Sequence, residues 1–330
     1  MDMLNNDLPG DYEAALQGAA YFPQPQAGCL HLTGEHRLDF LQRQTSNDLR
    51  QLTEARSALT VLVSPTARIL DVLRVLPQGE TLLALTLPGH AAATLSYLRR
   101  RIFFMDKVVL ADASAEVWQV DLEGPGANQA LVRLGFQSTL VLDEVARVDL
   151  PRGWLAAIGQ RGLAGLGFRL LAEASVREEL EHSLAAAGAV VLSPDSRHIL
   201  RVEAGLPAAG AELSEEYTPL EAGMEHAVSG DKGCYPGQEV LARQVTYDKV
   251  TQRLVGLKLS EPVTPGARLL AEGKLAGLVT SAAVSPRFGV IALGLVKRPH
   301  YEAGTRLEVE TQGNAEVVAL PQEGKAIGNG

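Results

Sequence analysis

The sequence predicts an α+β protein that ends in a small all-β domain. Helical and strand-like segments alternate without the regular βαβ rhythm of a doubly wound sheet, and hairpin signals interrupt them. The pattern of the sequence changes near Asp248: after this residue, short apolar runs alternate with turn residues. The chain has 330 residues, of which 46% are hydrophobic and 21% charged, so two or three domains with sizeable cores are expected.

The region before Asp248 contains the expected helices. Periodicity and flanking turn residues predict helices over residues 11–20, 34–44, 91–103, 127–134 and 174–187. The last is the clearest, because Val176, Leu180 and Leu184 recur every four residues. Strands are expected at residues 28–33, 57–63, 71–76, 81–87, 108–110, 117–122 and 199–202.

Residues 249–330 are expected to form a β-barrel domain. Short β-like runs cover residues 253–259, 268–270, 275–282, 290–296 and 306–310, with glycine-containing turns between them. We therefore place a domain boundary near Asp248. Residues 1–248 are expected to form the α+β region, with one sub-domain built from residues 1–49 and 114–248 and another from residues 50–113.

Composition disfavours several classes of function. The net charge is −9 and the one basic run is Arg99-Arg100-Arg101, so no tight nucleic-acid binding is expected. The two cysteines, Cys29 and Cys234, lie far apart and indicate a reducing cytoplasm rather than a disulfide framework. The histidines show no metal-ligand spacing, and no segment reaches the roughly 18 apolar residues that cross a bilayer. Neither a metal site nor a membrane partner is expected.

The segment Asp231-Lys-Gly-Cys-Tyr-Pro-Gly-Gln-Glu239 is the first candidate for chemistry. Its two glycines permit a tight backbone path close to a ligand, and Pro236 stiffens the loop. Lys232 lies two residues from Cys234, where a cation would favour the thiolate. Such a loop presents a nucleophile or a ligand; the alternative is a tight turn around a buried, inert cysteine.

The second candidate is Arg201-Val-Glu-Ala-Gly-Leu-Pro207. Glu203 stands at the end of the strand expected at residues 199–202, just before a glycine–proline turn. A carboxylate has two acceptor oxygens and can take two parallel N–H donors from a ligand. The alternative is a surface charge or an ion-pair partner of Arg201.

These segments resemble the folate-binding YgfZ family, the branch of the glycine-cleavage T-protein superfamily linked to iron–sulfur protein maintenance. Lys232-Gly-Cys-Tyr-Pro-Gly-Gln-Glu239 matches the signature of that family, and residues 201–207 match its Arg-x-Glu-Ala-Gly-x-Pro stretch. The resemblance covers most of the chain and extends to residues 32–34, 40–48, 64–68, 124–125, 277–286 and 292–294. Ala67 stands where glycine is usual in the family.

The resemblance implies a three-domain ring of the T-protein type, which binds tetrahydrofolate or another reduced folate near its central hole through residues 1–248. It implies that the pterin-binding carboxylate is Glu203 and that Cys234 and Lys232 are the catalytic positions. The other cofactor-binding residues that it implies are Arg201, Tyr235, Gln238 and Arg243, the last as an anion contact.

The expected function is that of a cytoplasmic, tetrahydrofolate-binding accessory protein for iron–sulfur cluster assembly or repair, with iron–sulfur enzymes as partners and an indirect effect on tRNA modification. One alternative is a tetrahydrofolate-dependent aminomethyltransferase or other one-carbon transferase. In the aminomethyltransferases a catalytic aspartate begins a helix of the second domain, and the matching Pro88-Gly-His90 contains no acid. A second alternative is a non-catalytic scaffold with a vestigial folate site, so the sequence leaves enzymatic activity open.

Overall fold

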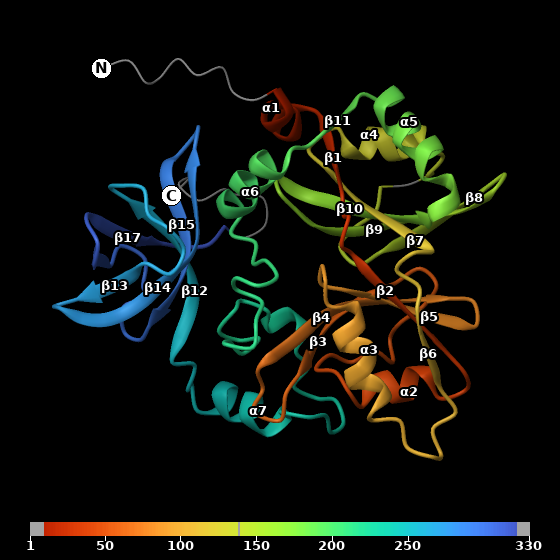
Figure 1. Ribbon diagram of the computed structural model, residues 1–330, viewed down its shortest axis with the longest axis horizontal. Helices are drawn as coiled ribbons and strands as arrows, with labels where there is room; N and C mark the ends of the chain where they lie inside the picture. Colours follow the sequence, from red (N-terminus) through yellow and green to blue (C-terminus); the bar gives the residue numbers. More distant parts are fainter. Residues whose placement is uncertain (1–9, 138, 322–330) are drawn as a thin grey trace.

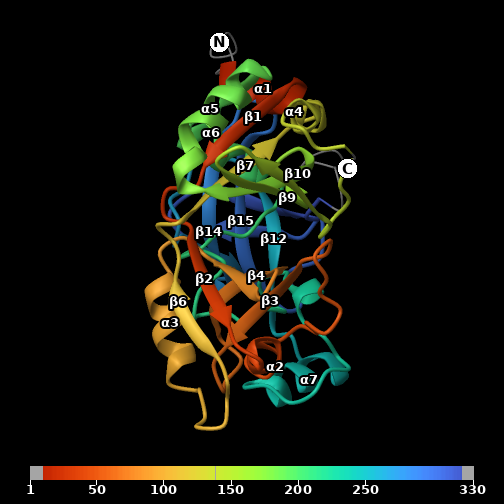
Figure 2. The same ribbon diagram turned by 90° about the vertical axis from the view of Figure 1, so that its right-hand side faces the viewer.

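The computed structural model describes residues 10–137 and 139–321 and contains three β-structures (Figure 1). Two are open sheets of six and five strands, and the third is a closed six-stranded barrel. Helices cover the sheets, which confirms the α+β class with a C-terminal barrel. In Figure 2 the first sheet lies above the second, and strands of the barrel lie behind both.

The first sheet has the strand order β11-β1-β7-β10-β9-β8. Its strands are β1 (Ala19–Pro23), β7 (Val117–Glu123), β8 (Val145–Leu150), β9 (Gly153–Gly162), β10 (Gly165–Glu173) and β11 (Ala189–Val191). All neighbours pair antiparallel except β1 and β11. Helices α1 (Gly10–Gln17), α4 (Ala127–Arg133) and α5 (Arg177–Ala186) pack on this unit, and α5 confirms the amphipathic helix expected from its leucine spacing.

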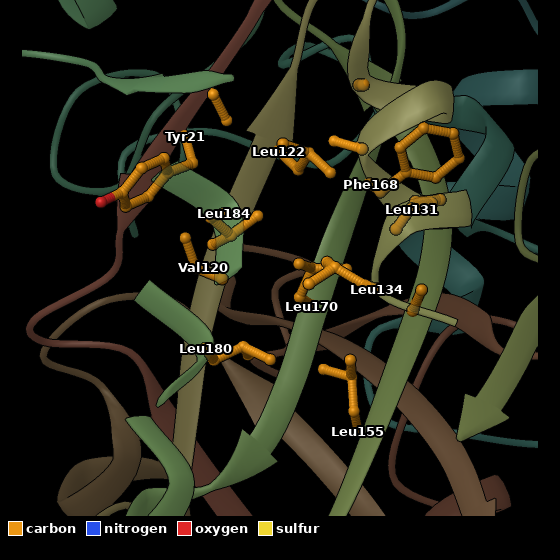
Figure 3. Close-up of a cluster of buried hydrophobic side chains, with 14 of the residues drawn as sticks. Tyr21, Val120, Leu122, Leu131, Leu134, Leu155, Phe168, Leu170, Leu180 and Leu184 are labelled. Carbon is orange, nitrogen blue, oxygen red and sulfur yellow. The ribbon is translucent and has the colours of Figure 1, made fainter. Parts of the chain in front are cut away.

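Alternation along β7 divides the first sheet into an apolar and a polar face. Val120 and Leu122 point into the core beneath α4 and α5, where Figure 3 shows them among leucines of the neighbouring elements. Successive side chains of a strand point to opposite faces, so Asp121 and Glu123 lie on the other side. Both side chains are nonetheless buried, so two carboxyl groups lie inside the protein on the polar face of this sheet.

The second sheet has the order β3-β4-β5-β2-β6. Its strands are β2 (Gly28–Thr33), β3 (Ala58–Val63), β4 (Ile69–Gln78), β5 (Thr81–Thr86) and β6 (Val109–Asp112), and helices α2 (Arg37–Gln42) and α3 (Ala91–Arg99) cover it. β2 pairs with β5 and β6. Residues 28–33 therefore belong with this sheet, because their hydrogen-bonding partners lie in β5 and β6, although the sequence analysis grouped residues 1–49 with 114–248.

The barrel closes in the order β12-β15-β14-β13-β16-β17. Its strands are β12 (Gln252–Leu259), β13 (Arg268–Ala271), β14 (Lys274–Ser285), β15 (Gly289–Lys297), β16 (Arg306–Val309) and β17 (Asn314–Val318). Each of the five β-like runs expected after Asp248 coincides with one of these strands, and β17 is an addition. Helix α7 (Gln238–Thr246) precedes the barrel.

The strand expected at residues 199–202 is wrong, because these residues form the last turns of helix α6 (Pro194–Glu203). Pro194 occupies the first turn, where its missing N–H costs nothing, and the Ser193 hydroxyl accepts the Ser196 N–H at 3.2 Å. The helix packs against β14 and β15 of the barrel. Packing on the barrel and a capped start outweigh the local strand preference of Ile199 and Val202.

Candidate functional site

A cavity of about 1170 Å³ lies where the two sheets, the barrel and residues 205–231 meet. Ligand pockets of proteins typically have volumes of about 300–1,000 Å³, so a cofactor-sized molecule fits. The first sheet contributes polar groups to its wall, and the second sheet contributes mainly apolar ones. Lining residues include Asp121, Glu123, Gln160, Arg169, Arg197, Leu59, Val72, Leu85, Met224 and Leu254.

Asp121 is the centre of a fully partnered charge cluster in this wall. Gln160 donates to its Oδ1 at 2.8 Å, Gln24 donates to its Oδ2, and Arg169 donates to both oxygens. Arg197 lies 3.7 Å from Oδ2. Burial alone raises the pKa of Asp121, but the two arginines outweigh it and hold the pKa below its ordinary value. Asp121 is therefore a fixed negative charge.

Glu123 lies two residues further along the same face of β7 and behaves differently. Its Oε2 accepts the Leu163 N–H at 2.9 Å, and the side chain lines the cavity although the residue is only 3% exposed. Burial, with a smaller contribution from the Asp121 charge, raises the pKa of Glu123 to about 8. Glu123 thus carries a proton at neutral pH and can release it near pH 8, which is the property of an acid–base group.

Two glycines of the β9–β10 hairpin make room for the Glu123 carboxyl group. A Cβ atom added at Gly162 would lie 2.3 Å from Glu123 Oε2, and one at Gly167 would lie 2.6 Å from it. Both distances are far below van der Waals contact, so any side chain at these positions would displace the carboxyl group. The hairpin and β7 therefore fix Glu123 together.

Arg201 is the one predicted cofactor-binding residue that lines the cavity, among the residues that the structure describes. Its guanidinium donates to Leu206 O at 2.8 Å, Ser281 Oγ at 2.8 Å and Glu212 Oε2 at 3.3 Å. Those bonds tie α6 to the barrel. Arg201 therefore holds this part of the cavity wall in place, and these N–H groups are already bonded to protein acceptors.

Glu203 does not appear in the cavity wall. Its Oε1 accepts hydrogen bonds from the hydroxyls of Tyr12 and Ser285, each at 2.6 Å, and its Oε2 lies 3.6 Å from Arg287. Burial and the Glu203 carboxylate raise the pKa of Tyr12. The structure thus makes Glu203 an ion-pair partner of Arg287 rather than of Arg201. Its contact with a pterin stays a prediction that this geometry does not favour.

Lys232 fixes the cysteine loop to the end of α2. Its ammonium donates to the carbonyl oxygens of Gln42, Thr45 and Asn47 at 2.6, 2.5 and 2.7 Å. Three acceptors use the three N–H donors of the charged form, although burial lowers the pKa of Lys232 to about 8. The N–H donors of the ammonium are therefore occupied by backbone carbonyls. An electrostatic effect of Lys232 on Cys234 stays a prediction.

The thiol of Cys234 is exposed, which excludes the alternative of a buried, inert cysteine. The loop around it is held by Tyr235, which is buried in the core beside α7, and by Gln238, whose Nε2 donates to Lys232 O at 3.4 Å. Arg243 is exposed on α7. None of the five predicted residues in this segment lines the central cavity, among the described residues: Cys234, Lys232, Tyr235, Gln238 and Arg243.

Gly237 explains part of the signature around Cys234. It has a φ of 79°, and a Cβ there would lie 2.6 Å from Ser64 O, so only glycine fits. The loop thereby packs on the turn at residues 64–67. Ala67 in that turn has a φ of 61°, the left-handed region that glycine favours, which accounts for the glycine usual at this position in the resembling family.

We expect a thiol-specific reagent at neutral pH to label Cys234 alone in the native protein. Cys29 is buried in β2, and burial raises the pKa of its thiol to about 12, so it offers no thiolate. Mass spectrometry should find one label per chain, and Cys234→Ser should remove it while Cys29→Ser should not. Native labelling of Cys29 at a similar rate would contradict this assignment.

Among the described residues, no group of three or more histidine, cysteine, aspartate or glutamate side chains has the geometry to hold a metal ion. No helix in the described part of the chain is long and apolar enough to cross a membrane.

Comparison with known proteins places the chain in a family. Residues 7–232 match the GCVT N-terminal domain, and residues 252–322 match the glycine cleavage T-protein C-terminal barrel domain. A putative chloroplastic transferase of Arabidopsis thaliana is 32% identical over 286 residues, which are 86% of this chain and 66% of that protein. The aminomethyltransferase of Geobacillus kaustophilus is 30% identical over 331 residues, which are 96% of this chain and 90% of that protein.

A solved structure shows the same fold. The glycine cleavage system aminomethyltransferase T of Bartonella henselae superposes with a TM-score of 0.83 over 96% of this chain and 90% of that one, at 23% identity. The two family domains together account for both sheets and the barrel. The chain belongs to the glycine cleavage T-protein family.

Proposed function

We propose that the protein binds a reduced folate in the central cavity and catalyses one-carbon transfer with it. The observation that carries this proposal is Glu123, a buried carboxyl group with a pKa of about 8 in the wall of a cofactor-sized cavity. The names of the relatives, aminomethyltransferase and putative transferase, support a transfer reaction. The segment Pro88-Gly-His90 before α3 contains no acid, and in this proposal Glu123 of β7 supplies one.

The cavity offers the donor set that a pterin requires. A pterin edge presents N–H donors and carbonyl and ring-nitrogen acceptors, and this wall combines a carboxyl group with the amide of Gln160 and with arginines. Leu59, Val72 and Leu85 provide apolar surface for the faces of the ring. The residues present therefore fit a reduced folate.

The residues of the wall have separate tasks in this proposal. A bound tetrahydrofolate would supply a nitrogen that accepts or releases the one-carbon group. Glu123 holds or takes the proton that this nitrogen exchanges, because its pKa lies close to neutral pH. The Asp121 charge, fixed by Arg169 and Arg197, helps to keep the proton on Glu123, whereas the two arginines themselves favour its release. The apolar second sheet keeps water away from the exchange.

Calorimetric titration with tetrahydrofolate tests the binding part of the proposal. The wild type should bind, and Glu123→Ala should weaken binding by about tenfold to a hundredfold, as expected for loss of a hydrogen bond to a charged or protonated carboxyl group. Glu123→Gln and Glu203→Gln form the matched pair, because each removes one carboxyl group and the second is the carboxylate that the resemblance implies. Loss of binding in Glu203→Gln with no effect in Glu123→Ala would assign the pterin to Glu203 instead.

The transfer part of the proposal has its own assay. Single-turnover transfer between tetrahydrofolate and an aminomethylated lipoyl carrier protein should occur with the wild type and fall with Glu123→Gln at saturating folate. Folate binding without transfer would limit the protein to an accessory role. No detectable folate affinity would favour the scaffold reading.

A second candidate function rests on a different observation, the exposed thiol of Cys234 in a loop fixed by Lys232. We propose, as this alternative, the role of the YgfZ branch: folate-dependent support of iron–sulfur enzymes in which Cys234 acts on the client protein. Cys234→Ala should then abolish complementation in cells, including effects on tRNA modification, while sparing folate binding. Equal complementation by mutant and wild type would exclude a chemical role of the thiol.

A further inference from the structure

The turn between α3 and β6 exposes the longest run of large apolar side chains in the described part of the chain. Phe103 is 65% exposed, Phe104 99% and Met105 70%. In Figures 1 and 2 the connection from α3 to β6 projects beyond the second sheet at one end of the molecule, away from the barrel. Neither the central cavity nor the cysteine loop accounts for these residues, since none of them lines the cavity.

The turn holds its shape through its own polar groups. Asp106 Oδ2 accepts the Phe103 N–H at 3.0 Å, and the Asp106 N–H donates to Phe103 O at 2.9 Å. Arg43 neutralises the same aspartate through a contact of 2.7 Å to Oδ1. The backbone N–H and C=O of Phe103 and the charge of Asp106 are thus already paired. This pairing lowers the cost of moving the apolar tip into an apolar medium.

Positive charge lies directly behind the tip. Arg99 donates to Leu110 O, Arg100 to Ser96 Oγ, and Arg101 lies over the Tyr97 ring at 3.4 Å. None of the three forms an ion pair with a described carboxylate. The chain as a whole has a net charge of −9, but these three arginines place positive charge next to the exposed phenylalanines.

We propose that this turn docks the protein on an anionic lipid surface, with the tip of residues 103–105 in the interface and Arg99, Arg100 and Arg101 at the level of the headgroups. Aromatic and apolar side chains with neighbouring cations are the combination that binds such interfaces. This replaces the expectation from the sequence that no membrane takes part.

The size of the tip favours a lipid surface over a protein partner. Two phenylalanines bury roughly 300–500 Å² together, and a stable protein interface needs about 800 Å² on each side. A convex turn of this size can enter a bilayer interface without a matching groove. The cations add attraction to anionic lipids that falls with salt.

Flotation with lipid vesicles tests the proposal on the full-length protein. The wild type should float with phosphatidylcholine vesicles that contain phosphatidylglycerol, and much less with phosphatidylcholine alone. The double variant F103S/F104S should lower the partition coefficient about tenfold or more, and Arg100→Gln about fivefold. Because these side chains are exposed, the variants should melt like the wild type and bind tetrahydrofolate like it.

Val284→Ser is the matched control, because Val284 is 62% exposed on the barrel, far from the turn, and its loss should leave flotation unchanged. Failure of the wild type to float with the anionic vesicles would overturn the proposal and leave protein docking as the use of the tip. Equal flotation of F103S/F104S and wild type would overturn it as well.

Discussion

Lys232→Met should lower the free energy of unfolding by about 3 kcal/mol, because it leaves one buried and two partly buried carbonyl oxygens without a donor. Methionine keeps most of the length and apolar volume of the side chain, so the loss reports the ammonium rather than a cavity. The residue is only 6% exposed, and water cannot readily replace the lost donor. Urea unfolding followed by fluorescence measures the change.

Lys249→Met is the control, since Lys249 is an exposed lysine beyond the end of α7 and its replacement should change stability by less than about 0.5 kcal/mol. Lys232→Met should also loosen the loop, so the labelling of Cys234 should change with it. If both lysine variants unfolded at the same urea concentration as the wild type, Lys232 would have no anchoring role, and its presence in the signature would need a chemical reason.

The sequence predicts those elements whose pattern is set locally. Helix α5 follows from Leu180 and Leu184, which are buried at the expected spacing, and the barrel strands follow from short apolar runs between glycine turns. Helix α6 could not be predicted in this way, because Ile199 and Val202 favour a strand locally. The contact with the barrel that stabilises the helix is visible only in the structure. The pairing of β2 with β5 and β6 joins segments that are distant in sequence, so local patterns did not predict it either.

The candidate site also contains a part that local sequence signals predict and a part that they do not. The glycines of the cysteine loop are a local signal, since Gly237 has a positive φ. The sequence singled out that loop as a candidate for chemistry, which stays a prediction. Asp121 and Glu123 were missed. Their signal was present: with Gln119 they place three polar side chains at alternate positions of one strand. What the sequence could not show is that this face is buried and that Arg169 and Arg197 reach it.

Lys232 has a structural role that its neighbours in the sequence did not indicate. Its position two residues from Cys234 suggested a local electrostatic effect on the thiol. The acceptors of its ammonium are carbonyl groups of residues 42–47, which lie far away in the sequence and carry no side-chain signature. Backbone partners of this kind cannot be predicted from residue types, so the anchoring of Lys232 became visible only in the structure, and its effect on the thiol stays a prediction.

Glu123→Gln should stabilise the protein above pH 8 and leave its stability unchanged at acidic pH. The native state holds the Glu123 proton up to about pH 8, whereas the unfolded chain releases it near the ordinary value of 4.5. Between these pH values the native state binds more protons than the unfolded state, so rising pH lowers the stability of the wild type. Glutamine removes this loss, which amounts to about 2–4 kcal/mol at alkaline pH.

The measurement is urea unfolding of wild type and variant from about pH 5 to about pH 9, a range that spans both protonation states. Glutamine can still accept the Leu163 N–H, so packing and the hydrogen bond of 2.9 Å persist and the comparison isolates the charge. Glu178→Gln, on the exposed face of α5, should leave the pH profile of the wild type unchanged. Parallel profiles for wild type and Glu123→Gln would mean that Glu123 is already ionised at neutral pH. Glu123 could then no longer hold the proton in one-carbon transfer, and its remaining use would be to accept N–H donors from the pterin.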